Sequence, residues 1–177
     1  ELSQVNNKNL IAIGRLDKVK GFADLITIMD ILVNKDSEIK LNIFGDGPEK
    51  ESLQELIKEK HLEKNIKLWG FKKYTFIKDY LKSSSLYLMT SFEESFGLVV
   101  IEAMSYGIPC IAFDSAKGVL DVINEDNGYL ISNRDIELYT KTILEYFELS
   151  SKDRKKISSE ARLAATKYSF DNVQKEW

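Results

Sequence analysis

The chain has 177 residues, of which 44% are hydrophobic and 30% are charged, and it contains only two prolines. This length and composition suit one compact domain with a substantial core, and they exclude a disordered or fibrous protein. The formal net charge of -3, from 25 basic and 28 acidic residues, argues against a nucleic-acid-binding protein, because such proteins usually carry a basic excess.

Short apolar segments alternate with helix-like segments along most of the chain. Apolar residues at helical spacing predict helices over 22–35 and over 48–60, the second with Pro48 in its first turn. Several of the short segments are apolar at consecutive positions, which is typical of strands covered on both faces. We therefore predict an α/β fold, a doubly wound parallel sheet with right-handed crossovers. The expected strands are 9–14, 40–45, 66–70, 86–90, 109–113 and 128–131.

From Ile136 onward the pattern is helical, over 136–150, 151–169 and 170–177. The basic residues of 151–169 are mixed with Asp153 and Glu160, so we interpret this segment as a solvated helix face rather than a membrane-binding one. The sequence thus predicts one domain, residues 1–177, with a C-terminal helical tail.

The chain shows no apolar run near 18 residues and no visible signal peptide, which predicts a cytoplasmic protein. It begins at Glu1 rather than at a methionine, so we expect a processed chain or an excised piece of a longer one. The single cysteine, Cys110, lies in an apolar run and is expected to be a small buried thiol. The single histidine, His61, lies among charges at a helix end and is expected at the surface. Without a Cys/His cluster, a zinc site is unsupported.

In a doubly wound sheet, ligands bind beyond the carboxyl ends of the strands, where helix N-termini present free amides. After the first expected strand come Arg15, Lys18 and Lys20, with Gly21 at the helix start. Cations at a helix N-terminus oppose the macrodipole and cost about 0.3–1 kcal/mol each unless an anion is also bound. We favour an anion clamp built from Arg15 and Lys20 over a solvated basic loop. By contrast, the segment 45–49, "GDGPE", is interpreted as a strand-to-helix turn, because it lacks the G-x-G-x-x-G spacing.

After the fourth expected strand comes "SFEESFGLVVIEAM", residues 91–104. Its first four residues, Ser91 to Glu94, match a capping box, which is one interpretation. The other has the helix begin near Phe96, with Glu94 in the preceding loop and Glu102 pointing back towards the helix N-terminus. Gly97 would then leave room for an anion at the free amides. Two carboxylates flanking a phosphate-binding helix end describe a nucleotide-sugar site.

The segments "GRLDKVKG", "GDGPE", "SFEESFGLVVIEAMSYGIPCIA" and "NGYLI" occur in the order and at about the spacing of a known domain. The chain resembles, from about Asn9 to Trp177, the carboxyl-terminal, donor-binding domain of GT-B retaining glycosyltransferases, the class called glycosyltransferase group 1 or family 4. The E-x7-E pair, Glu94 and Glu102, is specific in this context. The resemblance implies one Rossmann-like half of a GT-B fold and hexosyltransferase activity in the full-length protein, in the context of polysaccharide biosynthesis.

The resemblance also implies a role for each matching residue. Arg15 and Lys20 would hold the donor diphosphate and stabilise charge on the leaving group. Glu94 would contact hydroxyls of the transferred sugar, and Glu102 would hold the ribose hydroxyls of the nucleotide. The diphosphate would also meet the helix start formed by Phe96, Gly97 and Leu98. The loop after Gly70 is where family members commonly bind the base.

The chain departs from the family pattern at four places. Thr90 stands where proline is common, Asp121 where glutamate is usual, and Ser95 where glycine is common. The Ser95 hydroxyl could cap the helix and compete with phosphate for an amide. No role is assigned to the segment 114–119, which replaces a double-glycine loop.

The expected donor is a nucleoside diphosphate sugar, with UDP favoured, and the acceptor is a glycan or a lipid-linked sugar. No cofactor and no metal are expected, because two cations supply the charge and no D-x-D motif is present. The expected partner is an amino-terminal acceptor domain that this sequence lacks, so the chain alone should bind donor and transfer little. The resemblance also implies peripheral association of the full-length protein with the inner membrane surface. The alternatives are a related sugar-nucleotide epimerase and a non-enzymatic flavodoxin-like binding module.

Overall fold

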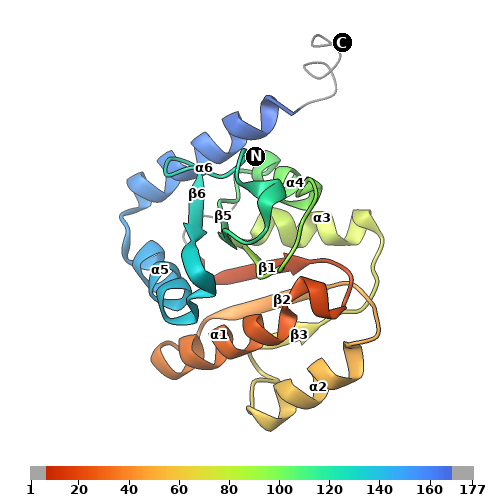
Figure 1. Ribbon diagram of the computed structural model, residues 1–177. Helices are drawn as coiled ribbons and strands as arrows, with labels where there is room; N and C mark the ends of the chain where they lie inside the picture. The colour runs from red at the N-terminus through yellow and green to blue at the C-terminus, as the bar shows by residue number, and fades with distance from the viewer. Residues whose placement is uncertain (1–6, 169–177) are drawn as a thin grey trace.

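The structure is a computed structural model that describes residues 7–168, and its centre is one six-stranded parallel sheet (Figure 1). The strands lie in the order β3-β2-β1-β4-β5-β6, which is the Rossmann order. The doubly wound prediction is confirmed. The flavodoxin-like alternative is wrong, because that fold has the order 2-1-3-4-5. The strands are β1 (Asn9–Ile13), β2 (Lys40–Phe44), β3 (Ile66–Leu68), β4 (Leu86–Met89), β5 (Cys110–Phe113) and β6 (Gly128–Ile131).

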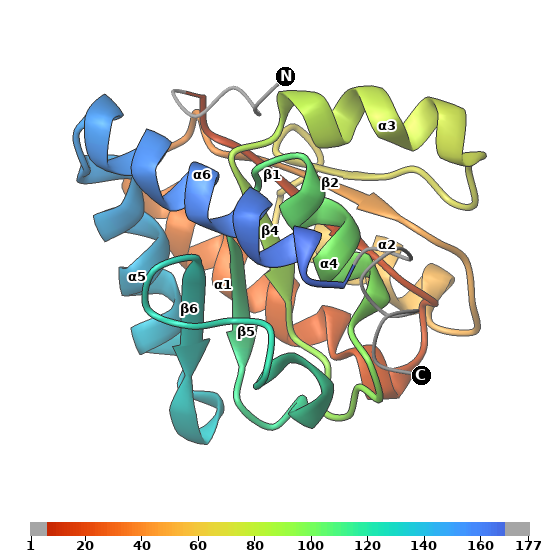
Figure 2. The same ribbon diagram turned by 90° about the horizontal axis from the view of Figure 1, so that it is seen from above.

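Helices cover both faces of the sheet, as Figures 1 and 2 show from two directions. One layer contains α1 (Phe22–Lys35), α2 (Lys50–Glu59) and α5 (Ile136–Glu148), which contact one another through α1. The other contains α3 (Tyr74–Ser83), α4 (Leu98–Ser105) and α6 (Ser151–Thr166), and α4 packs against α6. Among residues 7–168 there are also three single 3-10 turns: η1 (Lys18–Lys20), η2 (Lys117–Val119) and η3 (Ser132–Arg134).

Most predicted elements are confirmed, with two differences. The sequence analysis named no helix where α3 lies, although Ile77, Tyr80 and Leu81 stand at helical spacing and pack against the core. Pro48 does not lie inside α2, since the helix begins at Lys50 and Pro48 sits in the turn before the N-cap Glu49. The expected last helix, 170–177, lies outside the described residues.

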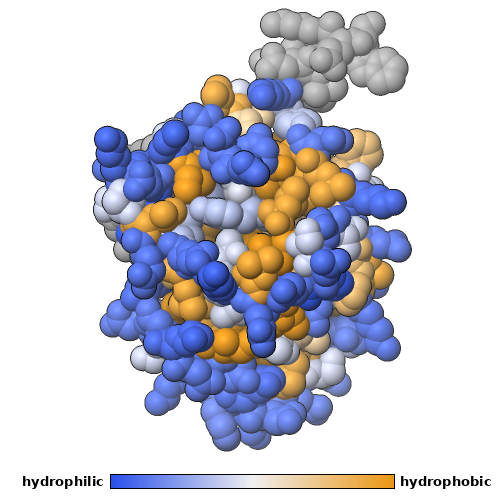
Figure 3. All heavy atoms as spheres, turned by 60° about the vertical axis from the view of Figure 1, so that its left-hand side comes forward, coloured by the Kyte–Doolittle hydropathy of each residue, from blue (hydrophilic) through white to orange (hydrophobic). Residues whose placement is uncertain are grey.

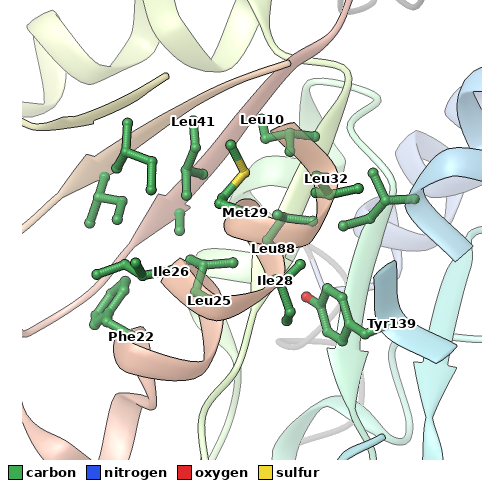
Figure 4. Close-up of a cluster of buried hydrophobic side chains, with 14 of the residues drawn as sticks. Leu10, Phe22, Leu25, Ile26, Ile28, Met29, Leu32, Leu41, Leu88 and Tyr139 are labelled. Atoms are coloured by element: carbon green, nitrogen blue, oxygen red, sulfur yellow. The ribbon is translucent and has the colours of Figure 1, made fainter. Parts of the chain in front are cut away.

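The core beneath the site is formed by α1 against the sheet. Figure 4 shows Leu25, Met29 and Leu32 of α1 directed at strand residues such as Leu10 and Leu41. All five are buried. Each side chain of this size contributes about 1.5–3 kcal/mol by leaving water, so α1 is held firmly and its N-terminal end has a fixed position at the edge of the sheet.

The isolated cysteine and histidine lie as predicted. Cys110 is fully buried in β5, and burial raises the pKa of its thiol well above the usual range, so the thiol stays protonated. His61 is exposed just after α2. Neither residue takes part in the site described below.

The face formed by α5, α6 and the β6 edge is largely hydrophilic, with smaller apolar patches between the polar side chains (Figure 3). α6 packs through small residues, Ser158, Ala161 and Ala165, while Lys152 and Lys156 are exposed. The Ser158 hydroxyl donates to the Gly107 carbonyl oxygen at 2.5 Å. These contacts agree with a solvated outer face for α6. Within residues 7–168, no helix combines the length and the apolar character needed to cross a membrane.

The sheet opens between β1 and β4. These two strands pair at Leu10–Leu86 and Ile11–Tyr87, near their amino ends. Beyond this point the Tyr87 hydroxyl stands in for the missing strand partner, because it donates to the Ile13 carbonyl oxygen at 2.9 Å and accepts from the Ile13 N–H at 3.3 Å. Burial raises the pKa of Tyr87 well above its usual value, which keeps this hydroxyl protonated.

β4 and β5, by contrast, stay paired as far as Met89 and Ala112, and Tyr139 of α5 contacts the backbone of both strands. Its hydroxyl donates to the Ile111 carbonyl oxygen at 2.6 Å and accepts from the Met89 N–H at 3.1 Å. β1 and β4 are therefore held apart at their carboxyl ends without leaving the polar backbone groups of Ile13 unpaired. A space remains there for a ligand.

We predict that Tyr87→Phe lowers the free energy of unfolding by about 1–3 kcal/mol, because both polar groups of Ile13 lose their partner. Tyr80→Phe is the matched control, since the Tyr80 ring packs among aromatic side chains and its hydroxyl makes no hydrogen bond with a described residue. The control should change stability by less than about 0.5 kcal/mol. Urea unfolding of the three proteins measures this, and equal losses in both variants would contradict the role of the Tyr87 hydroxyl.

Candidate functional site

The opening between β1 and β4 is a cavity of about 440 Å³, here called the central cavity. Ile13 and Met89 form part of its floor, and Arg15, Lys20 and Glu94 form part of its rim. It lies at the switch point of the sheet, where the strand order reverses. In folds of this class that crevice holds the ligand.

Two further cavities adjoin the central one along the same edge of the sheet. The aromatic cavity, about 380 Å³, shares Arg15 with it and is bordered by Phe44 and Phe71. The polar cavity, about 610 Å³, shares Lys20 and Glu94 with it, and it is bordered on the other side by Ser115 and Lys117. The three form one trough with cations and a carboxylate at its centre.

The cations are placed by the turn between β1 and α1. Asp17 caps η1, because its carboxylate accepts from the Lys20 N–H at 3.2 Å and lies 3.4 Å from the Arg15 Nε. Gly21 then reverses the chain with a φ of 64°, and a Cβ there would stand 2.3 Å from the Thr90 carbonyl oxygen. Only glycine allows η1 to approach the segment after β4 this closely.

The segment after β4 is tied to η1 by its backbone. The Phe92 N–H donates to the Val19 carbonyl oxygen at 2.8 Å, and the Thr90 hydroxyl donates to the Lys20 carbonyl oxygen at 3.2 Å. As a result the Lys20 Nζ lies 2.6 Å from a Glu94 carboxylate oxygen. The two side chains are only 27% and 19% exposed, so this ion pair is partly shielded from water.

The start of α4 faces the same cavity. Gly97 is its N-cap, with a φ of 60° and no side-chain capping bond, so neither a Ser91–Glu94 capping box nor a Ser95 cap forms. The first bond of the α-helical pattern is made by the Ile101 N–H to the Gly97 carbonyl oxygen at 3.2 Å. The N–H groups of Leu98 and the residue after it come before this bond and remain available to a ligand.

Glu102 and Gly97 differ from the other predicted site residues, because neither lines the central cavity. Gly97 is buried beside Val119. Arg15, Lys20 and Glu94 border the central cavity together with Phe96 and Leu98 of the predicted helix start. Glu102 is the fifth residue of α4 and is not among the residues that line that cavity. It lies instead on the side of α4 that faces α3, beside the Tyr74 hydroxyl. The structure thus separates the two glutamates of E-x7-E.

Arg134, which sequence reasoning missed, holds the segment after β4 in place. Its guanidinium donates to the Thr90 carbonyl oxygen at 2.9 Å and to the Ser91 carbonyl oxygen at 3.1 Å, and it pairs with Asp24 of α1. It also lies over the Phe92 ring, 3.6 Å from the centroid. The residues that follow each expected strand were searched for site residues, and this search found Arg15. The same search after the last strand, β6, would have found Arg134.

A second support comes from the segment after β5. The Gly118 N–H donates to the Glu94 carbonyl oxygen at 2.8 Å, and Val119 packs beneath the turn at Gly97. This is the segment to which the sequence analysis assigned no role. Among the described residues, no group of three or more His, Cys, Asp or Glu side chains is arranged to hold a metal ion.

Comparison with known proteins places this geometry in a family. The family model described as "Glycosyl transferases group 1" matches residues 1–164. An uncharacterized glycosyltransferase of Haemophilus influenzae is 30% identical over 178 residues, covering 100% of this chain and 50% of that protein. The poly(ribitol-phosphate) alpha-N-acetylglucosaminyltransferase of Staphylococcus aureus is 33% identical over 173 residues, covering 93% of this chain and 33% of that protein.

A solved structure agrees with the sequence relatives. A crystal structure of a TarM variant from Staphylococcus aureus, in complex with fondaparinux, alpha-GlcNAc-glycerol and UDP, matches with a TM-score of 0.88 and 30% identity. The match covers 100% of this chain and 35% of that one. The chain therefore spans half or less of the length of these relatives. By fold, by strand order and by the extent of the family match, the chain belongs to the group 1 glycosyl transferases.

Proposed function

We propose that residues 1–177 are the donor-binding domain of a GT-B retaining glycosyltransferase. The full-length enzyme moves a sugar from a nucleoside diphosphate sugar to a glycan or lipid-linked acceptor. The observation that carries the proposal is the meeting of Arg15, Lys20 and Glu94 around one cavity at the switch point of a Rossmann-type sheet. The family match favours sugar transfer over the epimerase alternative.

The donor diphosphate lies in the central cavity in this proposal. Lys20 and Arg15 approach it from the β1 side, and the amides at Leu98 approach it from the start of α4. The negative charge of the diphosphate grows as the glycosidic bond breaks. Fixed cations and a helix N-terminus already aimed at that charge stabilise the transition state without further reorganisation.

The two adjoining cavities suit the two ends of the donor. The aromatic cavity, with Phe71 on the loop after Gly70, takes the base, and the polar cavity takes the sugar. Glu94 borders the central and polar cavities, so its carboxylate accepts from sugar hydroxyls. Glu102, on the α3 side of α4, accepts from the ribose hydroxyls. UDP is the favoured nucleotide, and the UDP-bound TarM structure supports this choice.

Transfer requires a second, acceptor-binding domain, because the GT-B active site lies between two Rossmann-like domains. The share of the relatives that this chain spans supports this inference. We expect the chain alone to bind donor and to transfer little. In this proposal the enzyme acts in the cytoplasm, and the full-length protein contacts the inner membrane surface peripherally. Neither a nucleic acid nor a metal ion takes part in donor binding.

Removing either cation should weaken UDP binding. For Lys20→Ala and Arg15→Ala we expect the dissociation constant to rise roughly 10- to 150-fold, the cost of about 1.5–3 kcal/mol for a charge-assisted contact. Lys18→Ala is the matched control, because Lys18 lies on the same turn, is exposed and borders none of the three cavities. Isothermal titration calorimetry with UDP measures all four proteins. An equal loss in the Lys18 variant, or no loss in the other two, would rule out the clamp.

Glu94→Gln should change the affinity for the nucleotide and the affinity for the sugar in opposite directions. In the free site the Glu94 carboxylate competes with a diphosphate for Lys20, so its neutralisation should tighten the binding of UDP alone by about two- to fivefold. The same change weakens acceptance of sugar hydroxyls, so a UDP-sugar should lose its affinity advantage over UDP. Titration with UDP and with UDP-N-acetylglucosamine tests this, with Glu63→Gln at an exposed site as control. An unchanged affinity ratio would remove Glu94 from the sugar contact.

A further inference from the structure

Ser115 lies just after β5 and borders the polar cavity, and its hydroxyl has two partners in the fold. It donates to the Ser91 carbonyl oxygen at 3.3 Å and accepts from the Arg134 guanidinium at 3.1 Å. These directions follow from chemistry, because a carbonyl oxygen only accepts and a guanidinium only donates. A hydroxyl has one proton and two lone pairs, so one lone pair remains. Ser115 can therefore offer a ligand an acceptor, and its donor is already in use.

Arg134 is held from several sides, and this fixes the direction of the Ser115 hydroxyl. The Arg134 side chain is only 20% exposed and pairs with Asp24 of α1. The central carbon of its guanidinium lies 3.6 Å from the centroid of the Phe92 ring and 4.3 Å from that of the Phe113 ring. Phe92 and Ser115 both border the polar cavity. One guanidinium group therefore supports two parts of the wall of this cavity.

The segment that carries Ser115 is also fixed relative to Glu94, the other acceptor of the polar cavity. The Gly118 N–H donates to the Glu94 carbonyl oxygen at 2.8 Å. A Cβ on Gly118 would stand 2.5 Å from the Ser95 carbonyl carbon, so a glycine is needed for the two segments to approach this closely. In the free site the Glu94 carboxylate pairs with Lys20, whereas the partners of the Ser115 hydroxyl leave one lone pair open.

We propose that Ser115 accepts a hydrogen bond from one hydroxyl of the donor sugar, and that Arg134 is the positioning residue that sets the direction of the Ser115 hydroxyl. The proposal rests on the proposed function, in which the donor sugar occupies the polar cavity. A site that accepts without donating binds a sugar hydroxyl and gains nothing from a position that lacks a proton. Ser115 thus favours a donor with a free hydroxyl at the facing position over one that is deoxygenated there.

Calorimetry on this chain tests the contact with UDP and with whichever of UDP-glucose, UDP-galactose and UDP-N-acetylglucosamine binds most tightly. We expect Ser115→Ala to weaken that UDP-sugar about three- to tenfold, the value of one hydrogen bond, and to leave UDP unchanged. Among analogues of the sugar that each lack a single hydroxyl, one should bind both proteins equally, because it lacks the partner of Ser115. Ser105→Ala, which removes an exposed hydroxyl outside the three cavities, is the matched control.

Arg134→Lys tests the positioning role, because lysine keeps the charge but lacks the planar fork of donors. It should weaken the UDP-sugar relative to UDP, as Ser115→Ala does. In the Ser115→Ala background this effect should shrink, because part of it acts through the Ser115 hydroxyl. An equal effect in both backgrounds would show that Arg134 acts only through its other contacts, and it would overturn the positioning role.

The possible failures are distinguishable. If Ser115→Ala weakens UDP and the UDP-sugar equally, or if every analogue responds to it as the parent sugar does, Ser115 has only a structural role and the proposal is wrong. If none of the three UDP-sugars binds the unaltered chain more tightly than UDP, the polar cavity does not take the sugar and the proposal is wrong as well. Either result leaves the donor-binding role standing when Lys20→Ala still weakens UDP. UDP binding that is indifferent to Lys20→Ala would overturn the proposed function itself.

Discussion

The separation of β1 from β4 beyond their second paired residue is the constraint on which the site depends. A parallel sheet cannot simply open, because each exposed backbone N–H and carbonyl group would then lack a partner. Tyr87 solves this on the β1 side with a single hydroxyl that both donates to and accepts from Ile13. The space between the strand ends is therefore a stable part of the fold.

Backbone contacts determine which side chains border that space. The turn at Gly21 and the bond from Phe92 to Val19 bring two strand-end segments together, although they are about seventy residues apart in sequence. Arg134 fastens one of these segments to α1. These backbone contacts bring Lys20 and Glu94 together, so the position of the ion pair is set by the fold rather than by the two side chains. A diphosphate that enters finds a cation whose position is already fixed, and this limits the cost of reorganisation.

Sequence reasoning could reach the parts of this arrangement that follow from local pattern. Consecutive apolar residues predicted the parallel strands, and the rule of looking after each strand found Arg15, Lys20 and Glu94. It overlooked α3, although Ile77, Tyr80 and Leu81 stand at helical spacing and pack against the core. Arg134 was within reach of the same rule, yet no motif marks it, and its partners come from three distant segments.

The two glutamates of E-x7-E show why spacing alone gives an incomplete picture. In sequence they look equivalent, but the turn at Gly97 places Glu94 in the loop beside the cavity and Glu102 on the far side of a helical turn. Glu94 pairs with the Lys20 ammonium group, whereas no ion pair of Glu102 is present among the described residues. In the proposed site, an incoming diphosphate would therefore compete with Glu94, but not with Glu102, for its partner. Phosphate binding would free the Glu94 carboxylate for a new partner, such as a sugar hydroxyl.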